Sequence, residues 1–234
     1  VEYIKNTYGT VEYSREIETS IENEANKKKN YDVYCVMQQV SFLLSTVAIT
    51  CTYLMINDLI YVWLGEEFIL DSLVTVAIAL NMYFSVVLMP IWSYREATGM
   101  YMQTKYVMVI TALVNLVVSI ILGKILGLAG VLFATSIARI STYFWYEPKL
   151  LFKQFFEKNV WNYYKGILKN IIITLVVAGI CWLIFKNLAA RSWFILLVKA
   201  FFVLGCSVIL TIIGYCKDPY FSRLKTLIYR VIKK

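Results

Sequence analysis

The chain has 234 residues, of which 60% are hydrophobic and only 16% are charged, and its mean hydropathy is +0.66. Soluble domains carry about 25% charged residues, so this composition excludes an ordinary soluble protein and predicts a membrane protein. Histidine is absent and the five cysteines form no CxxC pair. The sequence therefore lacks the usual residues for metal binding or histidine-based catalysis, and we expect no enzyme, no cofactor and no metal.

Six segments are apolar enough to cross a hydrocarbon core about 30 Å thick. They are residues 33–57, 72–94, 106–123, 125–146, 170–185 and 192–216. The fourth contains Arg139 and the last contains Lys199. We therefore predict an all-α, polytopic membrane protein with six transmembrane helices. Its predicted parts are an N-terminal segment (1–32), a four-helix transmembrane part (33–146), a linker (147–169), a helical hairpin (170–216) and a basic amphipathic tail (217–234).

The distribution of Lys and Arg predicts the orientation of these spans. Positive charge concentrates in cytoplasmic loops, because insertion retains it on that side. Residues 1–32, 95–105, 147–169 and 217–234 together hold eighteen Lys and Arg, and the loops on the other side hold three. An even number of spans with this bias places both termini, the linker and the tail on the cytoplasmic side of the membrane.

Two cytoplasmic segments are predicted to lie at the membrane surface. From Phe221 to Ile232 the apolar residues share one face of a helical wheel, and basic residues lie opposite. The linker around Trp161 and Lys165 has a similar composition. The net charge of +8 is therefore explained by contact with anionic membrane lipids, and no nucleic-acid-binding motif accompanies it.

Polar side chains recur along one face of three predicted spans, although each is costly in hydrocarbon unless it has a partner. Ser and Thr at such positions often serve only helix packing. The three faces are Gln38, Ser41, Ser45 and Thr52; Thr111, Asn115 and Ser119; and Thr135, Arg139, Thr142 and Tyr146.

Arg139 is the residue that most strongly indicates a function. An arginine near mid-helix costs at least about 2.5 kcal/mol to insert and is tolerated mainly beside water, an anion or a carboxylate. No carboxylate lies in the middle of another predicted span, which favours an anionic ligand or a hydrated cavity. Snorkelling of the side chain, or an ion pair with Glu96 at a helix end, remains an alternative. Lys199 lies nearer the external end of its span and is expected to snorkel there.

Several stretches resemble a known family of transporters. They are IYVWLGEEFIL (60–70), YREATGMYMQTKY (94–106), NLVVSIILGKILGLAGVLFATSIARI (115–140) and YFWYEPKLLFKQFF (143–156). From about Ser20 to Phe156 the chain resembles the C-terminal part of Wzx-type polysaccharide (O-antigen) repeat-unit flippases, in the multidrug/oligosaccharidyl-lipid/polysaccharide exporter superfamily. Residues 1–19 depart from it, because they are polar where the family would be finishing an apolar helix.

This resemblance implies a two-lobed transporter that flips undecaprenyl-pyrophosphate-linked oligosaccharide repeat units for a cell-surface polysaccharide. The six spans would be the last part of such a protein, and a missing N-terminal lobe would complete the cavity. Cations for the phosphates would come from Arg139, Arg95 and Lys105, and contacts to the sugars from Asn115 and Asn81. Glu96 could couple transport to protons. Arg95 and Lys105 could instead serve only as positive-inside anchors.

Two alternatives remain open from the sequence. A multidrug-type exporter of the same superfamily would favour acidic residues in the cavity to capture cations. A membrane-embedded polysaccharide polymerase or glycosyltransferase would usually need an extended external loop or a soluble catalytic domain. The longest predicted external loop, residues 58–71, has about fourteen residues.

Overall fold

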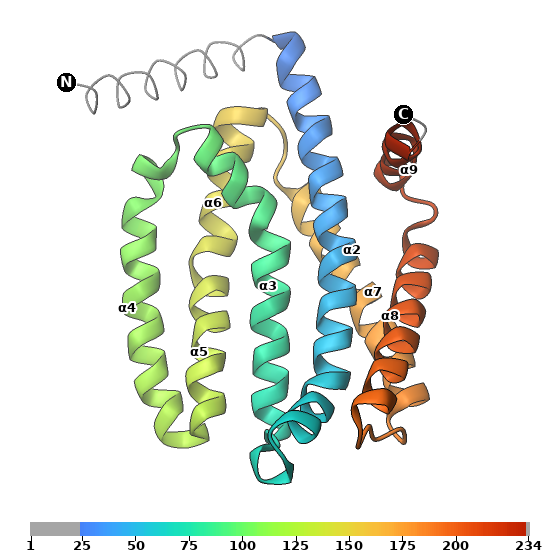
Figure 1. Ribbon diagram of the computed structural model, residues 1–234. Helices are drawn as coiled ribbons and strands as arrows, with labels where there is room; N and C mark the ends of the chain where they lie inside the picture. Colours follow the sequence, from blue (N-terminus) through green and yellow to red (C-terminus); the bar gives the residue numbers. More distant parts are fainter. Residues whose placement is uncertain (1–23, 233–234) are drawn as a thin grey trace, which may run out of the picture.

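The computed structural model describes residues 24–232, and every regular element in that range is a helix (Figure 1). The elements are α2 (Glu24–Trp63), η1 (Glu66–Phe68), α3 (Ser72–Ala97), α4 (Tyr101–Leu126), α5 (Leu128–Ser141), α6 (Tyr143–Leu151), the π-helical turn η2 (Phe152–Phe156), α7 (Trp161–Phe185), α8 (Trp193–Tyr215) and α9 (Pro219–Ile232). The all-α prediction is confirmed. The part of the N-terminal segment before residue 24 lies outside the described residues.

Six helical stretches are long and apolar enough to cross a membrane, which is the architecture of a multi-pass membrane protein. They are Lys28–Trp63, Ser72–Ala97, Met102–Leu126, Leu128–Phe156, Trp161–Phe185 and Trp193–Tyr215. The six predicted spans are thus all found. The fourth stretch ends inside the predicted linker 147–169, and the fifth begins inside it. The reason is that α6, η2 and the first turns of α7 make most of this linker helical. Their apolar side chains, such as Leu151 and Ile167, are buried and hold these turns against the bundle.

The helices form an open row rather than a closed ring (Figure 1). α2 packs against α3 on one side and against α7 and α8 on the other. α5 packs against α3 and α4, so that α4 lies at one edge of the row and the α7–α8 hairpin at the other. The start of α2 and the helix α9 lie at the same end of the molecule, as an even number of spans requires.

The α4–α5 hairpin depends on glycines at its turn. Gly127 has φ +59°, a left-handed conformation that glycine adopts without strain. A Cβ atom at Gly130 would clash with the backbone carbonyl of Leu122, so only glycine allows this close approach of the two helices. Most of the outer face of α4 is apolar and uncovered by the rest of the chain, as expected for a lipid-facing helix.

Aromatic rings pack the end of the molecule where α2 begins. The Tyr34 ring is 2% exposed, and its centroid lies 4.9 Å from that of Phe156 in η2. Phe156 also contacts Tyr94 of α3, with centroids 5.4 Å apart. Phe152 reaches α7, where its ring centroid lies 5.8 Å from that of Tyr163. These contacts fix η2 between α2, α3 and α7.

Candidate functional site in the membrane-spanning helices

The structure brings Arg139, in the last turn of α5, together with Asn81 near the middle of α3. Arg139 Nη1 donates to the Ser85 hydroxyl at 2.8 Å and to the Asn81 backbone carbonyl at 3.3 Å. The guanidinium also lies 5.8 Å from the centroid of the Trp92 ring. The Asn81 side chain links the same helices, because its Nδ2 donates to the Leu132 carbonyl at 2.7 Å. We call Asn81, Ser85, Ser136 and Arg139 the Arg139 cluster.

Every hydrogen-bond acceptor of Arg139 in the described part of the chain is neutral. Ser136 Oγ donates to Asn81 Oδ1 at 2.9 Å, which uses the remaining polar atom of that amide. Among residues 24–232, Arg139 takes part in no ion pair. Both of its hydrogen bonds come from Nη1, and its side chain is only partly covered. Within the described chain, no hydrogen bond is found for its other guanidinium N–H groups.

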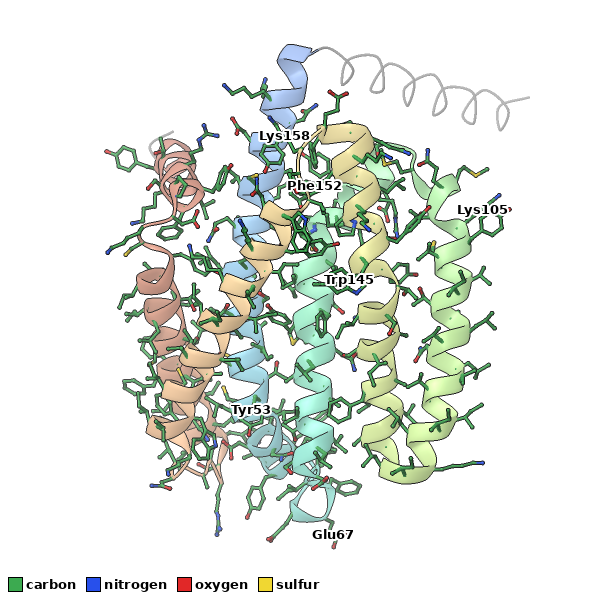
Figure 2. The ribbon with its side chains drawn as sticks, turned by 180° about the vertical axis from the view of Figure 1, so that it is seen from behind. Tyr53, Glu67, Lys105, Trp145, Phe152 and Lys158 are labelled. Carbon is green, nitrogen blue, oxygen red and sulfur yellow. The ribbon has the colours of Figure 1, made fainter. Side chains whose placement is uncertain are left out.

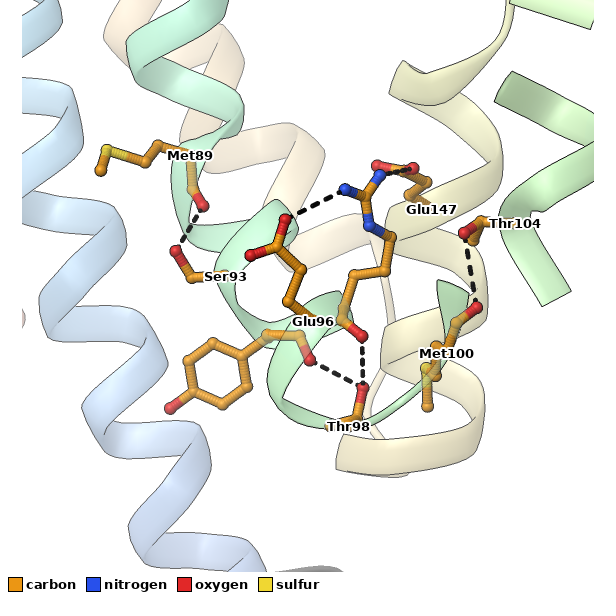
Figure 3. A network of polar contacts seen from close by, with 9 residues as sticks. Met89, Ser93, Glu96, Thr98, Met100, Thr104 and Glu147 are labelled. Atoms are coloured by element: carbon orange, nitrogen blue, oxygen red, sulfur yellow. Dashed lines mark hydrogen bonds and ion pairs between the residues drawn. The ribbon is translucent and has the colours of Figure 1, made fainter. Parts of the chain in front are cut away.

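Glu96 does not pair with Arg139, which removes one alternative left by the sequence. Glu96 instead contacts Arg95, its neighbour in α3, at 3.4 Å (Figure 3). The same guanidinium forms a shorter ion pair, 2.7 Å, with Glu147 of α6. The Glu147 side chain is 2% exposed and that of Glu96 is 71% exposed. Glu147 is thus the buried carboxylate at this end of the bundle.

Sequence reasoning missed Glu147 because it assigned this residue to a cytoplasmic linker. The short helix α6 instead carries Glu147 and Pro148 into the protein, where both are buried. Arg95 Nε and Glu147 Oε2 are buried without a hydrogen-bond partner among the described residues. The two residues are 52 positions apart, and no spacing in the sequence links them. Arg95 is therefore held by carboxylates in this structure, and a contact with substrate would have to compete with them.

The other two predicted site residues lie on α4, away from the Arg139 cluster. Lys105 is exposed at the start of the span, with Nζ 5.0 Å from the centroid of the neighbouring Tyr106 ring. Asn115 Oδ1 accepts a hydrogen bond from Ser119 one turn further along, at 3.3 Å. Nearer the Arg139 cluster, Thr111 and Thr142 join α4 to the α5–α6 junction through hydroxyls 2.6 Å apart. The structure thus connects the polar faces of the third and fourth spans, but it leaves Asn115 outside the cluster.

Lys199 finds a carboxylate where the sequence predicted snorkelling. Its Nζ lies 2.5 Å from Asp58 Oδ2 at the end of α2 and donates to the Leu188 carbonyl at 2.6 Å. The Lys199 residue is only 5% exposed. Asp58 also accepts from the Ala190 backbone N–H at 3.3 Å. This ion pair ties the α7–α8 hairpin to α2, so a structural role accounts for Lys199.

A second polar network was hidden from sequence analysis because its members lie on four helices. Asn170 of α7 is fully buried, and Tyr83 of α3 donates to its Oδ1 at 2.5 Å. Its Nδ2 donates to Tyr215 of α8 at 2.9 Å and to Thr46 of α2 at 3.2 Å. Both polar atoms of this amide are hydrogen-bonded within the protein, which indicates a role in packing rather than in substrate contact.

The sequence and the structure were compared with known proteins. No protein-family model, curated protein or solved structure matches the chain.

Proposed function

We propose that the chain is part of a bacterial inner-membrane flippase for undecaprenyl-pyrophosphate-linked oligosaccharide repeat units, with the substrate-facing role centred on Arg139. The observation that carries this proposal is the uncompensated guanidinium of the Arg139 cluster. A mid-span charge with only neutral partners in the described chain calls for water or an anion. The sequence resemblance to Wzx-type flippases supports a pyrophosphate as that anion.

The surroundings of Arg139 suit this substrate chemically. Guanidinium N–H groups bind phosphate oxygens in a bidentate manner, and Arg139 retains Nη2 and Nε for this purpose. The Asn81 amide and the Ser85 hydroxyl are already bonded within the protein, so the proposed substrate contact rests on Arg139 and a sugar would have to displace those bonds. The polyprenyl tail could stay in lipid, because the row of helices is open along its edges.

The two alternatives from the sequence were a multidrug-type exporter and a polysaccharide polymerase or glycosyltransferase. No contact among the described residues favours either of them. A cation exporter needs an unpaired acidic residue in the membrane. Glu147 is buried, but it is already compensated by Arg95.

Substitution of Arg139 tests the proposal. In a complementation assay, a strain that lacks the protein receives the gene that encodes this sequence. We expect Arg139→Ala to lose most transport in this assay, while the amount of protein inserted in the membrane stays normal. Arg139→Lys should recover part of the activity, since the charge survives and the bidentate geometry does not. Ser141→Ala is the matched control, because Ser141 is exposed on the same helix and bonds only the carbonyl of Ile137.

Two results would contradict the substrate role. One is full transport by Arg139→Ala. The other is a loss that matches the amount of protein missing from the membrane, which would identify Arg139 as a structural residue.

A further inference from the structure

Three lysines surround a hollow at the end of the molecule where α2 begins. The hollow has a volume of about 470 Å³ and lies between α6, η2 and the start of α7. Lys149, Lys153 and Lys158 line it together with the apolar residues Leu150, Phe152 and Val160. Figure 2 shows Lys158 beyond Phe152 at this end, and Glu67 at the opposite end.

The three lysines of the hollow form no ion pair within the described chain. Lys149 and Lys153 are four residues apart, so they share one face of the helical segment. All three lysine side chains are exposed. Among residues 24–232 no ion pair involves any of them, although four other basic side chains there do form ion pairs. No carboxylate lines the hollow, so the site is complementary to an anion.

Aromatic residues beside the hollow place it at the level of lipid headgroups. Tyr146 lines it and is 41% exposed, and the neighbouring Trp145 is 50% exposed. Trp161, which begins α7, is 62% exposed, and Tyr164 packs between the two indoles with ring centroids 5.1 Å and 6.0 Å away. Uncovered Trp and Tyr side chains are typical of the boundary between hydrocarbon and water.

We propose that this hollow binds the phosphate headgroup of an anionic phospholipid. The lysines would contact the phosphate, and the apolar floor formed by Leu150, Phe152 and Val160 would cover the glycerol and the first part of an acyl chain. A free anion fits less well, because it would leave this apolar floor in contact with water. Headgroup binding here is independent of the proposed transport and would anchor the α6–α7 connection to the membrane.

The test is lipid binding to the purified full chain in detergent micelles, measured by native mass spectrometry. The probes are short-chain phosphatidylglycerol and phosphatidylcholine of equal acyl length. We expect one phosphatidylglycerol to bind at least tenfold more tightly than phosphatidylcholine. Each lysine removed should weaken that binding about fivefold, which corresponds to about 1 kcal/mol per basic residue near an anionic lipid.

Matched triple variants separate a built site from general charge. The variant Lys149→Gln, Lys153→Gln, Lys158→Gln should lose the preference for phosphatidylglycerol. The control Lys124→Gln, Lys186→Gln, Arg191→Gln removes the same charge from exposed positions in the predicted external loops, which do not line the hollow, and it should keep the preference. The variant with arginine at all three hollow positions should also keep it. Circular dichroism melting curves will establish that each variant is folded.

Three outcomes would overturn the proposal. The two glutamine triples could weaken binding equally, which would mean that net charge alone attracts the lipid. Wild-type protein could bind both lipids equally. Inorganic pyrophosphate could bind as tightly as phosphatidylglycerol and displace it completely, which would mean that the hollow is a site for a free anion.

Discussion

The Arg95 guanidinium provides an internal comparison between a buried and an exposed ion pair. Arg95 contacts Glu147 at 2.7 Å and Glu96 at 3.4 Å. The two carboxylates differ in burial, since their side chains are 2% and 71% exposed respectively. We predict that Glu147→Ala destabilises the protein strongly and that Glu96→Ala hardly changes its stability.

The expected magnitudes follow from this difference in burial. Removing one partner of a buried pair leaves an uncompensated charge and costs about 3–5 kcal/mol. We expect a cost of about 3 kcal/mol for Glu147→Ala, the low end of this range. One reason is that Glu147 Oε2 and Arg95 Nε make no hydrogen bond in the described structure. The other is that Glu96 still offers Arg95 a carboxylate oxygen. An exposed pair contributes about 0–1 kcal/mol, which sets the expectation for Glu96→Ala.

The assay is reversible unfolding in mixed micelles, with the anionic detergent fraction raised and helix content followed by circular dichroism. A double-mutant cycle with Arg95→Ala isolates the pair, and we expect a coupling energy of about 2 kcal/mol or more between Arg95 and Glu147. Equal costs for Glu147→Ala and Glu96→Ala would refute the reasoning from burial. A coupling energy near zero would show that the two residues do not act as a pair.

Two further predictions concern the buried amide and the orientation of the chain. Asn170→Ala should lower the free energy of unfolding by about 1–3 kcal/mol in the same assay, because the hydroxyls of Tyr83 and Tyr215 lose a buried partner; an unchanged stability would contradict the network. A membrane-impermeant maleimide applied outside intact cells should modify Glu67→Cys at once and Lys158→Cys only after permeabilisation. Labelling in the reverse order would overturn the orientation predicted from the Lys and Arg distribution.

The sequence by itself determined the number of spans and the helical class of the protein. Whether a segment can cross a bilayer depends on its own length and hydropathy, since the hydrocarbon thickness is fixed by the lipid. The break between the third and fourth spans, predicted near residue 124, is also a local signal, and the structure has its turn close by at Gly127. For the same reason the amphipathic pattern from Phe221 to Ile232 identified a helix, which the structure describes as α9.

The sequence also identified Arg139 as unusual, because a charge in an apolar span is visible without any neighbour, whereas Asn81 was named only through the resemblance to flippases. Their closeness followed only from the packing of α5 against α3. Asn115 belongs to a similar polar face, but α4 lies at the edge of the row, and its amide bonds within its own helix.

Partners across the bundle were decided by the tertiary structure. Glu147 is 52 residues from Arg95, and Lys199 is 141 residues from Asp58. The sequence analysis placed Glu147 in a cytoplasmic linker and expected Lys199 to snorkel, so it could not choose the partner of either charge. That choice depends on how each helix is rotated about its axis and which neighbour it faces, and these are set by the packing of all the helices together.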